Sequence, residues 1–238
     1  MLENIKLEKI LFLDIETTSA VKSYDELSDD FKKHWEHKSN FIGKENETPS
    51  ETYSRAGIYA EFGKIVCISV GYIKIENGLK QLRLKSFYNH NEAELLVDFF
   101  ELLNKHYNTP QHVLCAHNGK EFDYPYIARR GLVNGLNIPD ILDLAGKKPW
   151  EVQHLDTLQL WKFGDYKHFT SLSLLTTIFN IPTPKDDIDG SMVNKVYWEE
   201  NNLERIATYC QKDVVALTQL FLRFRNEQLI HDNQIFYS

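Results

Sequence analysis

The sequence predicts one α/β domain over residues 1–238, with a mixed sheet of about five strands flanked by helices. Three observations support this. A continuous apolar run, Ile10–Leu13, is typical of a central strand buried on both faces. A later segment rich in Ile and Val and the alternating segment after it have the spacing of a hairpin, and the remaining half of the chain is mostly helical in periodicity. No repeat or linker divides the chain, and 238 residues suffice for one core.

The first strand is predicted over residues 9–15, where Asp14-Ile15-Glu16 closes it. The composition of the chain then changes, because 13 of the 30 residues from Lys22 to Glu51 are charged. We expect this segment to form one or two solvated helices and a loop. It would be a charged insertion at about residues 20–60, between the first strand and the next.

The next elements follow from turn and capping signals. Residues 64–75 and 79–88 are predicted to pair as a hairpin around Asn77-Gly78. Asn91, with Glu94 three residues later, is a helix-start signal. A further short strand is predicted over residues 111–116. Apolar residues at helical spacing predict helices over residues 91–107, 124–133, 157–163, 171–179 and 203–225.

Composition excludes several classes of function. Lys plus Arg is 27 and Asp plus Glu is 34, so the formal net charge is 27 − 34 = −7, and no basic run exceeds two residues. This argues against a protein that coats duplex nucleic acid through phosphate neutralisation, and against a polybasic membrane anchor. The sequence also lacks the glycine-rich nucleotide-binding motifs G-x-x-x-x-G-K-[ST] and G-x-G-x-x-G.

We expect the protein to be cytoplasmic and not to associate with a membrane. No apolar run approaches the roughly 20 residues that cross a bilayer, and residues 1–9 alternate charged and apolar side chains, unlike a signal peptide. The cysteines Cys67, Cys115 and Cys210 are odd in number, lack a C-x-x-C pair and lie among apolar neighbours. We interpret them as buried reduced thiols, neither a disulfide framework nor a zinc site.

Two carboxylates mark the end of the first predicted strand. Asp14 and Glu16 point to the same face of the strand, roughly 6–7 Å apart along it. Such a pair next to an apolar strand is costly unless a cation pairs with it. The alternative is that the strand has simply reached solvent.

Two further carboxylates lie on predicted helices. Asp123 follows the second short strand and precedes Pro125, which suits the first turn of a helix; Asp123 could instead be only an N-cap. Asp213 lies one turn after Tyr209 on the last helix and borders its apolar stripe. The alternative for Asp213 is a solvated residue paired with Lys212 or Arg205.

Together these segments resemble a known pattern. Asp14-Ile15-Glu16-Thr17-Thr18, residues 118–126 (NGKEFDYPY) and residues 209–214 (YCQKDV) are similar to the three exonuclease motifs of family B DNA polymerases, in the DEDDy branch of DnaQ-like 3′→5′ exonucleases. The sister branch has His five residues before the last Asp, where this chain has Thr208. The likeness spans residues 9 to about 225, so the chain resembles a freestanding bacterial member. The resemblance implies an RNase H-like fold.

The resemblance also implies a mechanism and a set of site residues. Asp14, Glu16, Asp123 and Asp213 would bind two Mg²⁺ or Mn²⁺ ions, with Asp14 bridging them, and Tyr209 would orient the attacking water. Hard divalent ions suit a set of oxygen ligands. Tyr209 is a poor base, since a phenol has an unperturbed pKa of about 10.

Substrate contacts are expected around this centre. The resemblance assigns Ile15 and Thr17 to the terminal 3′ nucleotide and Asn118 to its phosphate, and Phe122 is expected to pack beneath Asp123. Aromatic residues for which core packing is favoured at each single position, although some could stack on bases, are Tyr124, Tyr126, Trp150, Trp161 and Phe163. Candidate contacts to the nucleic-acid backbone, or plain surface charges, are Lys120, Arg129, Arg130, Lys147, Lys148 and Lys185. Asp187 and Asp189 form a competing pair, but in a segment that predicts a loop.

The function predicted from these residues is a metal-dependent 3′→5′ exonuclease on single-stranded DNA that releases nucleoside 5′-monophosphates. The same chemistry on RNA stays open, because nothing in the sequence reads a 2′-OH. A catalytically silent RNase H-like interaction scaffold and a phosphoesterase on mononucleotides are also compatible with the sequence. The partners expected are nucleic-acid 3′ ends, DNA before RNA, and a protein of DNA repair or replication. The pathway, the oligomeric state, the role of the insertion and the metal used in the cell stay open.

Overall fold

The computed structural model describes residues 2–165, 167, 169–182 and 188–238, so Lys185 and Asp187 lie outside the described residues. Its centre is a six-stranded mixed sheet with the strand order β5-β4-β1-β2-β3-β6. The strands are β1 (Ile10–Ser19), β2 (Gly63–Glu76), β3 (Leu79–Tyr88), β4 (Val113–Ala116), β5 (Leu155–Asp156) and β6 (Ile235–Tyr237). The predicted mixed α/β fold is confirmed, with one strand more than expected in the described part of the chain.

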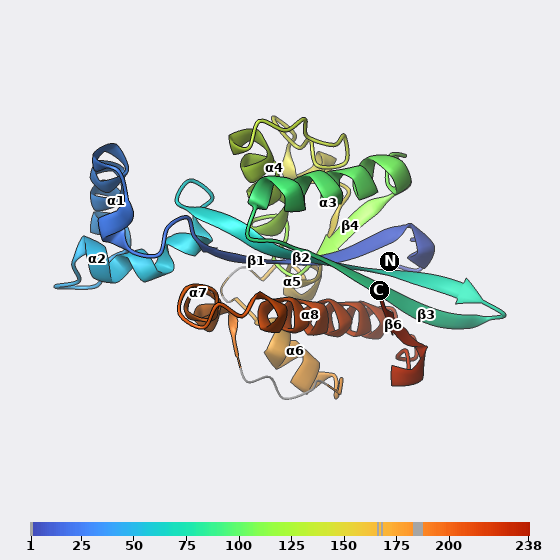
Figure 1. Ribbon diagram of the computed structural model, residues 1–238. Coiled ribbons are helices and arrows are strands. Elements are labelled where there is room, and N and C mark those ends of the chain that lie inside the picture. Colours follow the sequence, from blue (N-terminus) through green and yellow to red (C-terminus); the bar gives the residue numbers. More distant parts are fainter. Residues whose placement is uncertain (1, 166, 168, 183–187) are drawn as a thin grey trace.

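Helices cover both faces of this sheet (Figure 1). On one face lie α3 (Glu92–His106) and α4 (Asp123–Val133), and on the other lie α5 (Thr157–Lys162), α6 (Leu172–Ile178), α7 (Val193–Trp198) and α8 (Leu203–Phe224). Strand β1 supplies both cores, because its side chains alternate between faces. Leu11 and Leu13 pack towards α3, whereas Ile10 and Phe12 pack towards α8.

The local signals identified most boundaries. The β2–β3 turn has positive φ at both Asn77 (51°) and Gly78 (78°), as a two-residue hairpin turn requires. Asn91 caps α3 by accepting a hydrogen bond from the Ala93 N–H. The sequence did not reveal β5, α7 or β6. All three are short, and β6 pairs through only three residues with β3, 153 positions earlier.

Strand β1 is longer than predicted. It continues past Asp14–Glu16 to Ser19, with a bulge between Glu16 and Thr17. The reason is its pairing: β2 accompanies β1 as far as Ser19, but β4 pairs only with Ile10–Phe12. The second half of β1 therefore has one open edge, on the side where β4 has ended.

The charged segment between β1 and β2 forms α1 (Asp29–Ile42) and α2 (Pro49–Thr52), which project beyond the sheet in Figure 1. Trp35, Tyr53 and Phe62 build a separate small core here. Single 3-10 turns complete the described chain at Leu7–Lys9, Tyr24–Glu26, Tyr53–Ile58, Pro149–Glu151, Gly190–Met192 and Asp232–Gln234.

None of the helices in the described ranges combines the length and the apolar character that crossing a lipid bilayer requires.

Candidate metal centre

Strand β1 presents Asp14 and Glu16 towards α8. Asp14 is half-buried and Glu16 is buried, and each offers an oxygen to a cluster completed by the Cys210 thiol. The three potential ligand atoms lie within 4.8 Å of one another. The carboxylates thus occupy the face of β1 that Ile10 and Phe12 share, beyond the apolar part of that face.

Asp123 approaches Asp14 from the open edge of β1, although it is not one of the three residues whose ligand atoms lie within 4.8 Å of one another. It is buried at the first position of α4, and the Ile15 N–H donates a hydrogen bond to it. That N–H is available because β4 ends at Ala116. Burial, and next the charge of Asp156, raise the pKa of Asp123 to about 7. The alternative that Asp123 is only the N-cap was wrong, because Phe122 occupies the N-cap position of α4.

Helix α8 contributes the last carboxylate and the phenol. Burial is the main cause of the raised Asp14 pKa, and the negative charges of Asp213 and Asp123 are the next causes. Burial also raises the pKa of Tyr209 far above its usual range, with further contributions from Asp213 and Glu16. The phenol therefore keeps its proton at neutral pH and can act as a donor, but not as a general base.

The donor set fits a divalent cation. Burial, followed by the charges of Asp14 and Asp213, raises the Glu16 pKa well above its ordinary value. In the described ranges, no Lys, Arg or His forms an ion pair with Asp14, Glu16 or Asp123. Like charges in a buried site are stabilised by a cation, and hard cations prefer carboxylate oxygens.

The residues expected to contact substrate lie around this cluster in different ways. The Ile15 side chain packs into the core on the α3 face, so only its backbone faces the site edge. Thr17 is half-buried just after the bulge. Asn118 has a left-handed backbone with φ of 65° in the loop before α4. Phe122 packs against the core beside Tyr126, with ring centroids 5.3 Å apart.

Several peripheral candidates prove to be structural. Tyr124 and Tyr126 are buried, and their hydroxyls donate to the carbonyls of Leu155 and Gly57, so neither ring can stack on a base. Arg130 is also buried, in an ion pair, and is no surface contact for a phosphate. For Tyr124 and Tyr126 core packing is confirmed, through partners 31 and 69 residues away in sequence. The expectation for Arg130 was wrong, because its ion-pair partner lies 38 residues away.

The remaining candidates contact other parts of the protein or are exposed at its surface. Trp161 stacks on Phe224 of α8, and Lys120 donates to the Val152 carbonyl. Asp189 caps a 3-10 turn through the Ser191 N–H. The exposed side chains are Arg129, Lys147, Lys148, Trp150 and Phe163.

Two residues beside the cluster are not predicted from the sequence. The Cys210 thiol donates to the Asp14 carboxylate at 3.3 Å, whereas its apolar neighbours in the sequence predict only a place in the core. Asn194 of α7 holds the end of β1, because its Oδ1 accepts hydrogen bonds from the Thr18 hydroxyl and the Ser19 N–H. The position of Cys210 between Tyr209 and Asp213 was a usable signal; Asn194 had none.

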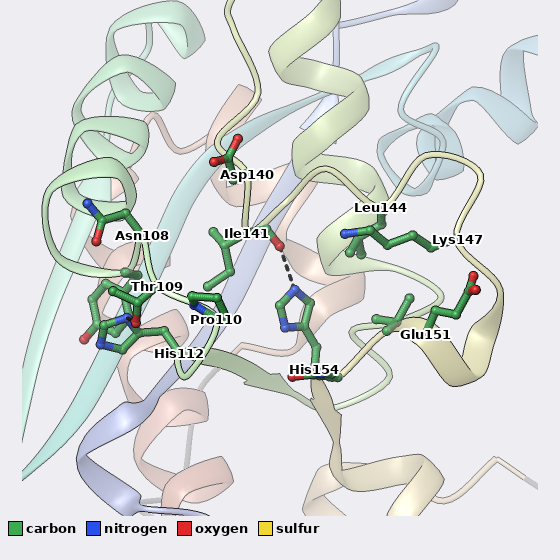
Figure 2. Close-up of a pocket in the computed structure, with 13 residues that line it drawn as sticks. Asn108, Thr109, Pro110, His112, Asp140, Ile141, Leu144, Lys147, Glu151 and His154 are labelled. Atoms are coloured by element: carbon green, nitrogen blue, oxygen red, sulfur yellow. Dashed lines mark hydrogen bonds between the residues drawn. The ribbon is translucent and has the colours of Figure 1, made fainter.

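A cavity of about 310 Å³ lies at the other end of β4 (Figure 2). His112, which precedes β4, lines it, whereas Asp123 follows β4. His154 is buried beside this cavity: its Nε2 donates to the Ile141 carbonyl at 2.7 Å, and its Nδ1 accepts the Leu114 N–H. Both ring nitrogens are used by the backbone, so this histidine supports the fold and is not free to act as a base.

A protein-family model matches most of this chain. The model is described as "Predicted 3'-5' exonuclease related to the exonuclease domain of PolB", and it matches residues 58–234. This range includes Asp123, Tyr209 and Asp213 but begins after Asp14 and Glu16, which join the cluster through the geometry of β1.

Relatives and a solved structure agree with the family model. A DNA polymerase of Pyrococcus glycovorans is 26% identical and DNA polymerase 1 of Pyrococcus abyssi 27% identical, each over 183 residues. Each alignment covers 69% of this chain and 23% of the relative, so the chain spans about a quarter of their length. The family B DNA polymerase of Pyrobaculum calidifontis shares the fold, with a TM-score of 0.52 and 15% identity over 90% of this chain and 24% of that chain. The chain therefore belongs to the family of predicted 3′-5′ exonucleases related to the exonuclease domain of PolB.

Proposed function

We propose that this chain is a metal-dependent 3′→5′ exonuclease of the tyrosine (DEDDy) type, which hydrolyses single-stranded DNA from the 3′ end and releases nucleoside 5′-monophosphates. The observation that carries the proposal is the meeting of carboxylates from three distant segments at one edge of the sheet. Asp14 interacts electrostatically with both Asp123 and Asp213, although each of the three lies about 100 residues from the next one along the chain. Family membership supports the same chemistry.

Each residue has a role in this proposal. Asp14, Glu16, Asp123 and Asp213 would hold two Mg²⁺ or Mn²⁺ ions. When bound, such ions activate water and neutralise charge on the reacting phosphodiester oxygens. Tyr209 keeps its proton because burial and the carboxylates raise its pKa, so its hydroxyl would orient the attacking water.

The substrate side rests on neighbouring groups. We assign Thr17, Asn118 and the Ile15 backbone to the terminal nucleotide, with Phe122 supporting Asp123. Phe169 is a further candidate for stacking on a base: its ring is 64% exposed and lies edge-on to His117, at 6.1 Å between centroids. Aromatic stacking tolerates any base and requires an unpaired strand.

The net charge of −7 and the absence of a long basic run favour binding of only a few nucleotides at the 3′ end over binding along an extended strand. We therefore expect weak, salt-sensitive binding without a protein partner from DNA repair or replication. Three buried free thiols support a reducing, cytoplasmic setting.

The test uses single-stranded oligonucleotides labelled at the 5′ or the 3′ end, as DNA and as RNA, with Mg²⁺, Mn²⁺ or EDTA. We expect 5′-labelled DNA to shorten as a ladder, 3′-labelled DNA to release one labelled mononucleotide at once, and EDTA to stop both. Asp14→Ala should abolish this activity. Asp98→Ala is the matched control, because Asp98 is an exposed carboxylate on α3, across the sheet from α8.

Other outcomes would replace the proposal. Laddering of RNA alone would make the enzyme an exoribonuclease. Internal cuts, or activity that survives Asp14→Ala, would contradict the assigned site. Intact substrate under every metal condition would favour a catalytically silent scaffold.

A further inference from the structure

Asp156 is a buried carboxylate outside the predicted site, at the end of the two-residue strand β5. It is 2% exposed and accepts four backbone hydrogen bonds. Two come from the start of α5: the Leu158 and Gln159 N–H groups donate to its Oδ1 at 2.9 and 3.2 Å. These two make Asp156 an ordinary N-cap, as its place before Thr157 suggests.

The other two bonds have no part in capping. The Asn118 N–H donates to Asp156 Oδ1 at 3.0 Å, and the Lys120 N–H donates to Oδ2 at 3.1 Å. Asn118 and Lys120 belong to the loop between β4 and α4. This loop has little other support from the sheet, because β4 and β5 pair only through Cys115–Leu155 and Ala116–Asp156.

A continuous chain of hydrogen bonds leads from this loop to Asp123. The carbonyl of Asn118 accepts the Phe122 N–H at 3.0 Å, and the carbonyl of Gly119 accepts the Tyr124 N–H at 3.0 Å. These are the residues on either side of Asp123. The loop is also tightly packed, since a Cβ on Gly119 would lie 2.4 Å from the Cβ of Ala116.

We propose that Asp156 is a positioning residue for the exonuclease site: its carboxylate clamps the Asn118–Lys120 loop and so sets the place of Asp123 at the open edge of β1. The proposal rests on the proposed function only for the role of Asp123. Asp156 itself acts through the loop backbone. A placement error of about 1 Å in such a group can cost 10²-fold in rate, so the clamp has a measurable consequence.

The two halves of the Asp156 contact set can be separated by substitution. Asp156→Ser keeps an N-cap oxygen for α5, but its shorter side chain loses the bonds to Asn118 and Lys120. Asp156→Asn is the milder variant, because an amide oxygen at the Oδ1 position keeps three of the four bonds and loses that to Lys120. Asn91→Ser is the matched control, an N-cap exchange on α3.

The experiment measures backbone amide hydrogen exchange and Mn²⁺ affinity by calorimetry, both without substrate, and then the steady-state kinetics of the full chain. In Asp156→Ser we expect exchange at Asn118 and Lys120 to accelerate at least tenfold while Leu158 and Gln159 keep their protection. Mn²⁺ affinity should fall about tenfold, and kcat should fall more than tenfold with KM within threefold. Asp156→Asn should show smaller changes of the same kind, and Asn91→Ser none.

Unchanged exchange at Asn118 and Lys120 in both Asp156 variants would overturn the clamp, as would faster exchange without weaker Mn²⁺ binding. The proposed function fails separately, when the wild-type chain binds Mn²⁺ but degrades neither DNA nor RNA. In that case the exchange and calorimetry results still decide whether Asp156 positions Asp123.

Discussion

Glu16 and Glu92 are equally buried, each with 7% of its surface exposed, yet their surroundings differ. Glu92, at the start of α3, has a cationic partner in Arg130 of α4. The guanidinium donates from Nε at 2.9 Å and from Nη2 at 2.5 Å. The Ile65 N–H at 2.7 Å and the Asn134 amide at 2.9 Å complete this set. Glu16 instead has the carboxylates of Asp14 and Asp213 near it, and burial, followed by these two charges, raises its pKa.

The difference separates a carboxylate with a counter-charge from one that lies among like charges. Glu92 joins α3, α4 and β2 because the protein supplies its counter-charge. Glu16 has no counter-charge among the described residues, so the folded chain carries the cost of a buried acidic cluster until a cation binds. Substitutions at the two places should therefore change stability in opposite directions, and only the one at Glu16 should change activity.

The largest effect is expected for Glu16→Gln. Removing one carboxylate from the proposed metal centre should lower kcat at least 10⁴-fold, about 5 kcal/mol in activation free energy. The metal-free protein should become more stable, by about 1 kcal/mol, because a buried like charge is gone. Single-turnover nuclease assays and urea unfolding in EDTA measure the two effects. If Glu16→Gln lowers stability and leaves turnover normal, Glu16 is a structural carboxylate like Glu92, and the comparison is wrong.

Arg130→Met should have the next largest effect, on stability alone. It leaves Glu92 buried without a cation, so the free energy of unfolding should fall by about 3–5 kcal/mol. Urea unfolding measures it, and the exposed neighbour Arg129→Met is the control, with a change within about 0.5 kcal/mol. If both variants unfold alike, the Glu92 pair is not the support that its geometry implies.

Tyr209→Phe should have a smaller effect, on catalysis. Loss of the hydroxyl should reduce kcat more than tenfold, or about 1.4 kcal/mol, while Mn²⁺ affinity measured by calorimetry stays within twofold. Tyr88→Phe, at an exposed phenol of β3, should leave kcat unchanged. Weaker metal binding in Tyr209→Phe would show that the phenol supports the ligands and does not orient water.

The smallest effect is a pH dependence of the metal-free protein. The folded pKa of Asp123 is about 7, above the ordinary value of 3.8, and those of Asp14 and Glu16 are raised as well. Their protonated forms stabilise the fold. This stability is complete below about pH 4 and is lost as the pH rises through 7. In EDTA we expect a Tm lower by about 2–4 °C, ~1 kcal/mol, at pH 8 than at pH 6.5.

His154 opposes this trend at lower pH and must be separated from it. Burial lowers its pKa to about 4, so its contribution is present above the ordinary value of 6.5 and is lost as the pH falls towards 4. Comparing wild type with Asp123→Asn at each pH isolates the carboxylate. Identical pH profiles for the two proteins would contradict the raised pKa of Asp123, whereas saturating Mn²⁺ should flatten the wild-type profile.

Much of the fold was predictable because its signals are local. The apolar run of β1, the Asn77-Gly78 turn and the Asn91 cap each act within a few residues, and each was found in the expected place. The boundary of β1 was missed because strand length depends on neighbours. β4 stops early while β2 continues, and no local pattern reports that.

The candidate site divides in the same way. Asp14, Glu16, Asp123, Tyr209 and Asp213 are predicted as site residues from three motifs that resemble those of the family B exonucleases. The expectation for Arg130 was wrong, and only the structure decided that Tyr126 packs in the core, because their partners, Glu92 and Gly57, lie 38 and 69 residues away. A charge or an aromatic ring has no fixed role until its partner is known.

The sequence by itself thus determined the fold class, the family and the candidate carboxylates, since these depend on periodicity and on short motifs. Only the tertiary structure decided which buried charges are paired and where the edge of β1 is open to Asp123. It also showed that Cys210 contacts Asp14, that Asn194 holds the end of β1, and that Asp156 holds the loop before α4. The physical reason is that burial and hydrogen bonding join segments far apart in the chain, whereas a motif records only the residues within it.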